Sequence, residues 1–116
     1  MNEKMNAYFT AMENDAKKGV SYTNGQFKAC MAWENSKRFN NNELECDSLP
    51  WEQDMPDFLK TLREAGAETL AVTETSSGLM HGIHNLVNLG CTMEGVCIVK
   101  HFNGVMPSRG IRFRLN

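Results

Sequence analysis

The chain lacks the sequence patterns that indicate catalysis or metal binding. No CxxC pair occurs among its four cysteines, and its three histidines are not spaced with cysteines or carboxylates as in zinc sites. Neither a Walker lysine motif nor GxGxxG is present, which removes the usual nucleotide-binding signatures. GxSxG and HExxH are missing as well. We therefore expect no catalytic residue, no metal and no cofactor, and an enzyme is the weakest function class.

A long apolar run is also missing, so the sequence contains no candidate transmembrane helix. The polar residues 1–9 do not follow the basic-then-apolar plan of a signal peptide. We expect a cytoplasmic protein without membrane contact, in which Cys30, Cys46, Cys91 and Cys97 stay reduced. Because no repeat or linker divides the 116 residues, we expect a single domain over 1–116.

Residues 54–116 predict the element order αβαββ. Two amphipathic patterns at helical spacing each end at a glycine, Gly66 and Gly90, and the first begins at Asp54, a residue suited to N-capping. Period-two alternation marks the strands. The expected elements are a helix over 54–65, a strand over 68–73, a helix over 79–89, and strands over 92–102 and 110–115 joined by the loop 103–109.

A strand, a helix and a second strand of these lengths favour a right-handed parallel crossover, and the final hairpin adds an antiparallel strand. We therefore predict an α+β fold with a small mixed three-stranded sheet (βαββ), packed against helices on one face. The N-terminal part, 1–42, is predicted to be helical, with one helix over 2–18 and a second that Thr23 or Asn24 caps and Asn40–Asn42 ends.

Segment 43–53 is predicted to be an acidic loop. Leu44, Leu49 and Trp51 are scattered through it, and we expect them to anchor the loop to the core rather than form an element of their own.

Charge is distributed unevenly along the chain. Residues 1–75 carry a net charge of −5 and residues 76–116 a net charge of +3, within a total of −2. An acidic run without Lys or Arg is typical of a solvated loop, and interleaved apolar residues also favour a docking edge for a basic protein partner. The candidate protein-binding edge consists of Glu43, Glu45, Asp47, Trp51, Glu52 and Asp54, with Trp51 as its anchor.

The final hairpin carries a candidate basic patch of Lys100, Arg109, Arg112 and Arg114. Nucleic-acid modules usually combine such charge with a strongly basic domain or with exposed stacking aromatics, whereas the pI here is about 5.9. Three interpretations stay open: charges that protect an edge strand from aggregation, contact with nucleic acid, and contact with an acidic protein surface.

The junction between the strand over 68–73 and the following helix contains a candidate anion site, Thr75, Ser76, Ser77 and Gly78. Free amides at a helix start and nearby hydroxyls can hold a phosphate or a carboxylate. Ordinary capping of the helix by Ser or Thr is the favoured interpretation, because these residues are preferred caps whatever the function.

The segment 57–97 resembles a group of small uncharacterised bacterial proteins, often encoded on plasmids and conjugative elements of gut anaerobes. The shared features are the helix FLKTLREAG (58–66), a short strand, the helix start TETSSGLM (73–80) and the exit LGC (89–91). None of these motifs is catalytic. The resemblance implies the αβαββ order and a mobile-element accessory protein of unknown function, and it assigns no functional residue.

The interpretation favoured by these observations is a small non-catalytic protein-binding accessory or modulator protein of a mobile element, for example an inhibitor of a host defence system. A regulator that contacts nucleic acid through the basic hairpin is the first alternative, and a small enzyme or anion-ligand-binding domain is the second. The expected partner is a protein, and self-association stays open.

Overall fold

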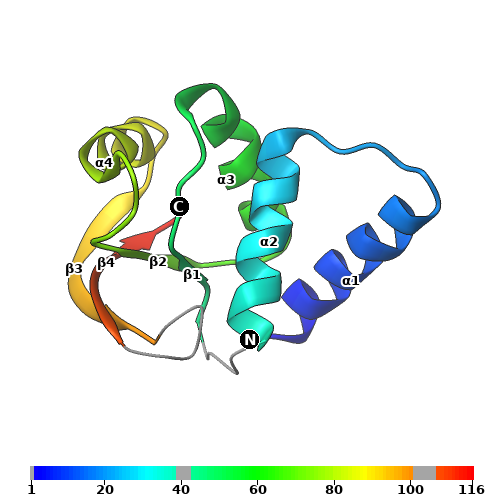
Figure 1. The fold of residues 1–116 in the computed structure, drawn as a ribbon, viewed down its shortest axis with the longest axis horizontal. Helices are drawn as coiled ribbons and strands as arrows, with labels where there is room; N and C mark the ends of the chain where they lie inside the picture. The colour runs from blue at the N-terminus through cyan, green and yellow to red at the C-terminus, as the bar shows by residue number, and fades with distance from the viewer. Residues whose placement is uncertain (1, 39–42, 101–106) are drawn as a thin grey trace.

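The computed structural model describes residues 2–38, 43–100 and 107–116. Within them the fold is α+β, with four α-helices and a four-stranded mixed sheet. Figure 1 shows α4 above β3 and β4, and α2 between the sheet and α1. The elements in chain order are α1 (Glu3–Lys17), α2 (Asn24–Arg38), β1 (Glu45–Cys46), the 3-10 turn η1 (Glu52–Asp54), α3 (Met55–Glu64), β2 (Thr69–Thr73), α4 (Leu79–Asn88), β3 (Thr92–Val99) and β4 (Ser108–Arg114).

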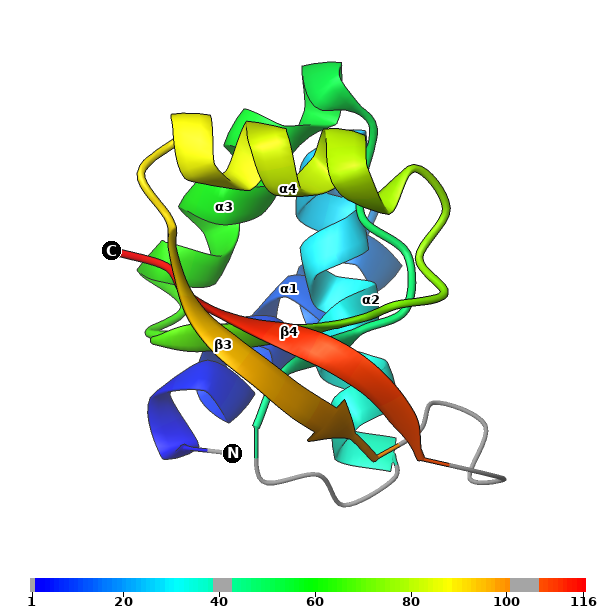
Figure 2. The same cartoon turned by 90° about the vertical axis from the view of Figure 1, so that its left-hand side faces the viewer.

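The sheet has the strand order β1-β2-β4-β3. Strand β4 runs antiparallel to both of its neighbours, while β1 runs parallel to β2. The crossover from β2 through α4 to β3 is therefore split by β4, which lies between the two parallel strands. Because β3 is the outermost strand, it faces the viewer together with α4 when the molecule is turned by 90° (Figure 2).

The predicted three-stranded sheet is wrong by one strand. Strand β1 lies inside the segment expected to be a loop, where Glu45 and Cys46 pair with Ala71 and Val72 of β2. The pairing begins with the Ala71 amide, which donates to the Leu44 carbonyl at 2.9 Å. A strand of two residues is too short to show alternation in a sequence, so the pattern 43–53 gives no sign of it.

The helix starts differ in detail from the sequence expectations. Thr23 and Gln26 form a reciprocal capping box at α2, since each side chain accepts from the other residue's backbone N–H. Asp54, in contrast, does not cap α3 with its side chain, because η1 precedes the helix and the Asp54 carboxylate accepts from Asn24 Nδ2 at 2.7 Å. The predicted break at Asn40–Asn42 and the loop residues 103–106 lie outside the described residues.

The core lies between the helices and the inner face of the sheet. Phe9 of α1 stacks on Trp33 of α2 with ring centroids 5.5 Å apart, and both are fully buried. Helix α2 buries a face of small residues beside Trp33, because Gly25 lies so close to α3 that an added Cβ would be 2.5 Å from the Asp54 carbonyl. Phe27 and Met31 of the same helix are exposed as a result.

Candidate binding surfaces

The basic hairpin and the acidic segment neutralise each other in part. Arg112 forms two hydrogen bonds to the Glu43 carboxylate, at 2.8 and 3.1 Å, which raise the pKa of the guanidinium. The other two arginines of the candidate basic patch pair similarly, Arg114 with Glu94 at 2.7 Å and Arg109 with Glu74 at 3.2 Å. The three guanidinium groups therefore do not form an unpaired positive surface.

The candidate acidic edge is not one surface in the structure. Glu45 is buried, its carboxylate accepts from the Lys100 amide at 3.1 Å, and burial raises its pKa. Asp54 binds Asn24 at the start of α2. Trp51 stands apart from both, and its 75% exposure shows that it does not anchor the segment to the core as expected. Leu44 and Leu49, the other two expected anchors, are buried.

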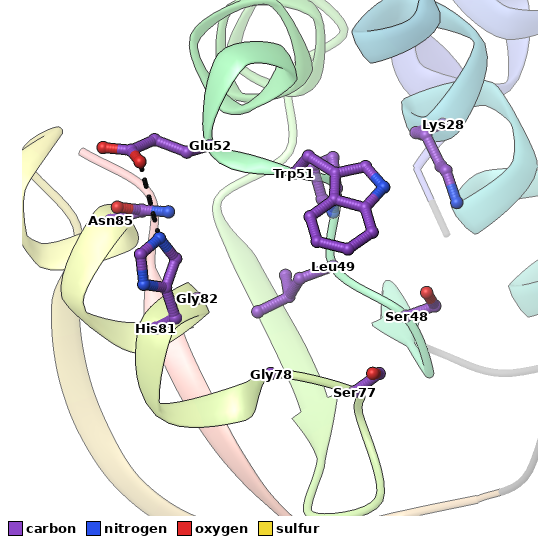
Figure 3. Close-up of a pocket in the computed structure, with 11 residues that line it drawn as sticks. Lys28, Ser48, Leu49, Trp51, Glu52, Ser77, Gly78, His81, Gly82 and Asn85 are labelled. Atoms are coloured by element: carbon purple, nitrogen blue, oxygen red, sulfur yellow. Dashed lines mark ion pairs between the residues drawn. The ribbon is translucent and has the colours of Figure 1, made fainter.

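A groove separates α4 from the segment 48–52, and it encloses about 160 Å³. Leu49 packs against Gly82, where an added Cβ would lie 2.5 Å from Leu49 Cδ1. Figure 3 shows Asn85 on one side of Trp51 and Lys28 on the other, with Ser77 and Gly78 below them. The lining residues are Lys28, Ser48, Leu49, Pro50, Trp51, Glu52, Ser77, Gly78, His81, Gly82 and Asn85.

The four residues of the candidate anion site lie in two places: two line this groove, and two form hydrogen bonds outside its lining. Thr75 Oγ1 lies 3.0 Å from Thr73 Oγ1, and Ser76 Oγ accepts from the Leu49 amide at 3.3 Å. Ser77 and Gly78 line the groove. The residue at the N-cap of α4 is Gly78, with φ +63°, and no side chain caps the helix. The expected Ser or Thr cap is therefore wrong, and the first amides of α4 lack a side-chain acceptor.

Asn85 was not singled out by the sequence and has the most unusual environment in the groove. Asn85 is only 6% exposed, and its Nδ2 atom is buried without a hydrogen-bond partner among the described residues. In Figure 3 this nitrogen points toward Trp51 and Leu49, and the carbonyl oxygen points away from them. Buried side-chain donors are usually satisfied, so an unpaired one in a groove indicates a partner that the protein itself does not supply.

Two histidines of the described ranges, His81 and His84, lie on α4, and burial raises the pKa of two cysteine thiols. His81 Nε2 lies 3.5 Å from Glu52, both at the exposed rim of the groove, and His84 contacts Asn88 one turn along α4. Burial raises the pKa of Cys30 to about 11 and that of Cys46 to about 12. Thiols with such pKa values are protonated at neutral pH and are weak nucleophiles.

Strand β3 exposes apolar side chains at the edge of the sheet, where no strand of the described ranges pairs with its outer side. Val96 is 89% exposed and Ile98 is 59% exposed, although both side chains belong to a paired strand. The opposite edge of the sheet, formed by β1, is covered by α2, because the Ser36 hydroxyl of α2 bonds to both the N–H and the carbonyl of Glu45 in β1. Strand β3 therefore presents exposed apolar side chains to another chain, whereas the backbone of β1 at Glu45 is already bonded to α2.

An open depression of about 610 Å³ adjoins this edge. Val96 and Ile98 line it together with the half-buried Ile111 of β4, and the ion pair of Arg109 and Glu74 lies at its side. The depression combines an apolar surface with one charge of each sign.

Within the described ranges, no three His, Cys, Asp or Glu side chains are grouped so that they could hold a metal ion. In the same ranges, no helix is both long and apolar enough to cross a bilayer.

Comparison with known protein families gives one match. The profile of a domain of unknown function (DUF7698) covers residues 28–107, a range that contains the 57–97 segment, all residues lining the groove and the whole of β3. No curated protein and no solved structure matches the chain.

Proposed function

We propose that this chain, which belongs to the DUF7698 family of domains of unknown function, is a non-catalytic protein-binding module that receives an extended segment of a partner protein along β3. The observation that carries the proposal is the open outer strand with Val96 and Ile98 exposed on it. An exposed, apolar edge strand is an established site for adding a strand from another chain.

Strand β3 has few of the features that protect edge strands from such pairing. It is eight residues long and contains no proline. Its single charged residue, Glu94, is held by Arg114 of the neighbouring strand. A register irregularity between Met93 and Gly95 disturbs the first part of the strand, so the regular part, 96–99, is the segment we assign to the partner.

An extended segment suits this surface better than a helix. Val96 and Ile98 are two residues apart and so share one face of the sheet, beside the apolar depression at Ile111. A partner strand would gain backbone hydrogen bonds from β3 and place its own alternate apolar side chains over that depression. The Arg109 and Glu74 pair beside it offers a partner for one charged side chain of either sign.

We assign the module to the cytoplasm, where four free thiols persist, and to an accessory or modulator role of the kind that the resemblance to mobile-element proteins implies. Nucleic-acid contact through the basic hairpin has less support, because Arg109, Arg112 and Arg114 each pair with a carboxylate.

The experiment compares the tagged full chain with Val96→Lys and Ile98→Lys, each used to capture proteins from host lysate after nuclease treatment. Val20→Lys is the matched control, because Val20 is also exposed but lies between α1 and α2. The captured protein is then purified and its affinity measured by calorimetry. We expect each β3 variant to lose roughly tenfold or more in affinity and the control to bind as the wild type does.

Equal affinity of the wild type and both β3 variants would overturn the assignment of β3. Light scattering on the purified chain tests whether a second copy of the chain occupies the β3 edge instead. A wild-type dimer that Val96→Lys converts to a monomer, without a captured partner, would mean that a second copy fills the edge and would refute the partner proposal.

A further inference from the structure

We propose that the groove between α4 and the segment 48–52 is a binding site for a small organic monoanion, with a carboxylate at one end and a hydrogen-bond acceptor at the other. This site is separate from the β3 edge, and neither proposal depends on the other. The groove has polar residues at its two ends and apolar side chains in its middle (Figure 3).

Asn85 defines the acceptor end. The Nδ2 group is buried, has no partner among the described residues, and is directed into the groove. A ligand carbonyl or ether oxygen placed there would satisfy this donor, while a purely apolar group would leave it unpaired. The nearby Glu52 carboxylate pairs with His81 at the rim and disfavours a second negative charge at this end.

The opposite end of the groove is rich in donors and carries a positive charge. Lys28 of α2 is half-buried, lines the groove and forms no ion pair with a described residue. The Ser77 hydroxyl and Gly78, at the uncapped start of α4, line the groove on the side below Lys28 in Figure 3. A carboxylate at this end would meet one full positive charge together with the positive end of the helix dipole.

The middle of the groove suits a flat apolar body. Leu49 and Trp51 contribute apolar side chains between the two polar ends, and the volume is about 160 Å³. A cavity of about 150 Å³ in another protein accommodates benzene, so one six-membered ring is the scale of ligand that fits here. A ring with a carboxylate and an acceptor at opposite positions matches all three parts of the groove.

The test is an NMR titration of the ¹⁵N-labelled full chain with 4-acetylbenzoate. A second titration uses 4-isopropylbenzoate, which has a similar shape and charge but no acceptor. The two tryptophans provide a built-in comparison, because Trp51 lines the groove whereas the Trp33 indole N–H donates to Asn6 at 2.9 Å inside the fold. We expect 4-acetylbenzoate to shift the Trp51 indole and Asn85 side-chain resonances and to leave the Trp33 indole unchanged.

Three variants separate the contributions of the two ends. Lys28→Gln should weaken 4-acetylbenzoate by roughly tenfold, since it removes a charge-assisted contact, whereas Lys60→Gln, at an exposed residue of α3 outside the groove, should not. Asn85→Leu should abolish the preference for 4-acetylbenzoate over 4-isopropylbenzoate. A role of Asn85 that is purely structural would not produce this exchange of specificity.

The carboxylate has two possible sources, a free small molecule and the C-terminus of a peptide. The second arm of the titration uses two dipeptides: N-acetyl-Ala-Phe with a free carboxylate, and the same dipeptide with a C-terminal amide. Tighter binding of the dipeptide acid than of 4-acetylbenzoate assigns the site to peptide termini, and the reverse assigns it to a free metabolite. The proposal is overturned if none of these anions moves the Trp51 and Asn85 resonances at millimolar concentration, or if the wild type does not distinguish acetyl from isopropyl.

Discussion

Replacing Asn85 with leucine should stabilise the protein, although it removes a polar group from a natural site. Leucine has nearly the shape of asparagine, so Asn85→Leu removes the unpaired Nδ2 donor without opening a cavity. An unsatisfied buried donor costs about 1–3 kcal/mol. For a domain of this size, that gain corresponds to an increase in the melting temperature of roughly 4–12 °C.

The assay is thermal unfolding of the wild type, Asn85→Leu and Asn88→Leu, followed by circular dichroism. Asn88 is the matched control, because it is on the same helix but exposed, with its side-chain amide 3.3 Å from His84. We expect no increase in melting temperature for Asn88→Leu. Natural binding sites often retain a group that is costly in the unbound protein, so a stabilised but binding-defective Asn85→Leu variant is the signature of such a site.

A decrease in the melting temperature of Asn85→Leu would refute this reasoning. It would mean that the Asn85 amide has a stabilising partner in the folded protein, so its orphaned donor would no longer indicate a ligand.

The stability of the wild type should fall as pH rises above about 4.5, the ordinary glutamate value, because the pKa of Glu13 is raised in the folded state by a hydrogen bond that its protonated carboxyl donates to Glu34 and by burial. Glu34→Gln should flatten this fall in urea titrations across pH 4–7. Arg63→Leu should lower the free energy of unfolding by about 1.5–3 kcal/mol, because the Arg63 guanidinium donates to the Leu115 and Leu89 carbonyls and so connects α3 to the ends of β4 and α4. An unchanged urea midpoint would contradict this. Gly110→Ala should disrupt the pairing of β4 with β2, because an added Cβ would lie 2.5 Å from a β2 carbonyl oxygen, and amide exchange of β2 would report it.

The order of elements in 54–116 was predictable because local signals repeat there. Gly66 and Gly90, with φ of +90° and +97°, end two helices at the residues where a left-handed backbone is required. The order of strands was not predictable from the same signals. Alternation identifies β3 and β4 as strands, but it does not show that β4 lies between β2 and β3.

The groove was only partly visible in the sequence. The sequence analysis assigned Trp51 and Ser77 to two separate candidate sites, and the packing of Leu49 on Gly82 places both residues in one groove. The burial of Asn85 was visible in the sequence, since it follows Gly82 by three residues on the face of α4 that also buries Leu86. A polar amide at a buried helical position needs a partner, which the sequence cannot supply.

Amide hydrogen exchange of β3 with and without the captured partner tests the central claim most directly. The backbone amides of 96–99 that point away from β4 should exchange freely in the isolated chain and become protected in the complex. Protection confined to other segments, such as 43–57 or the start of α4, with unchanged exchange along β3, would contradict the assignment of β3 as the docking edge.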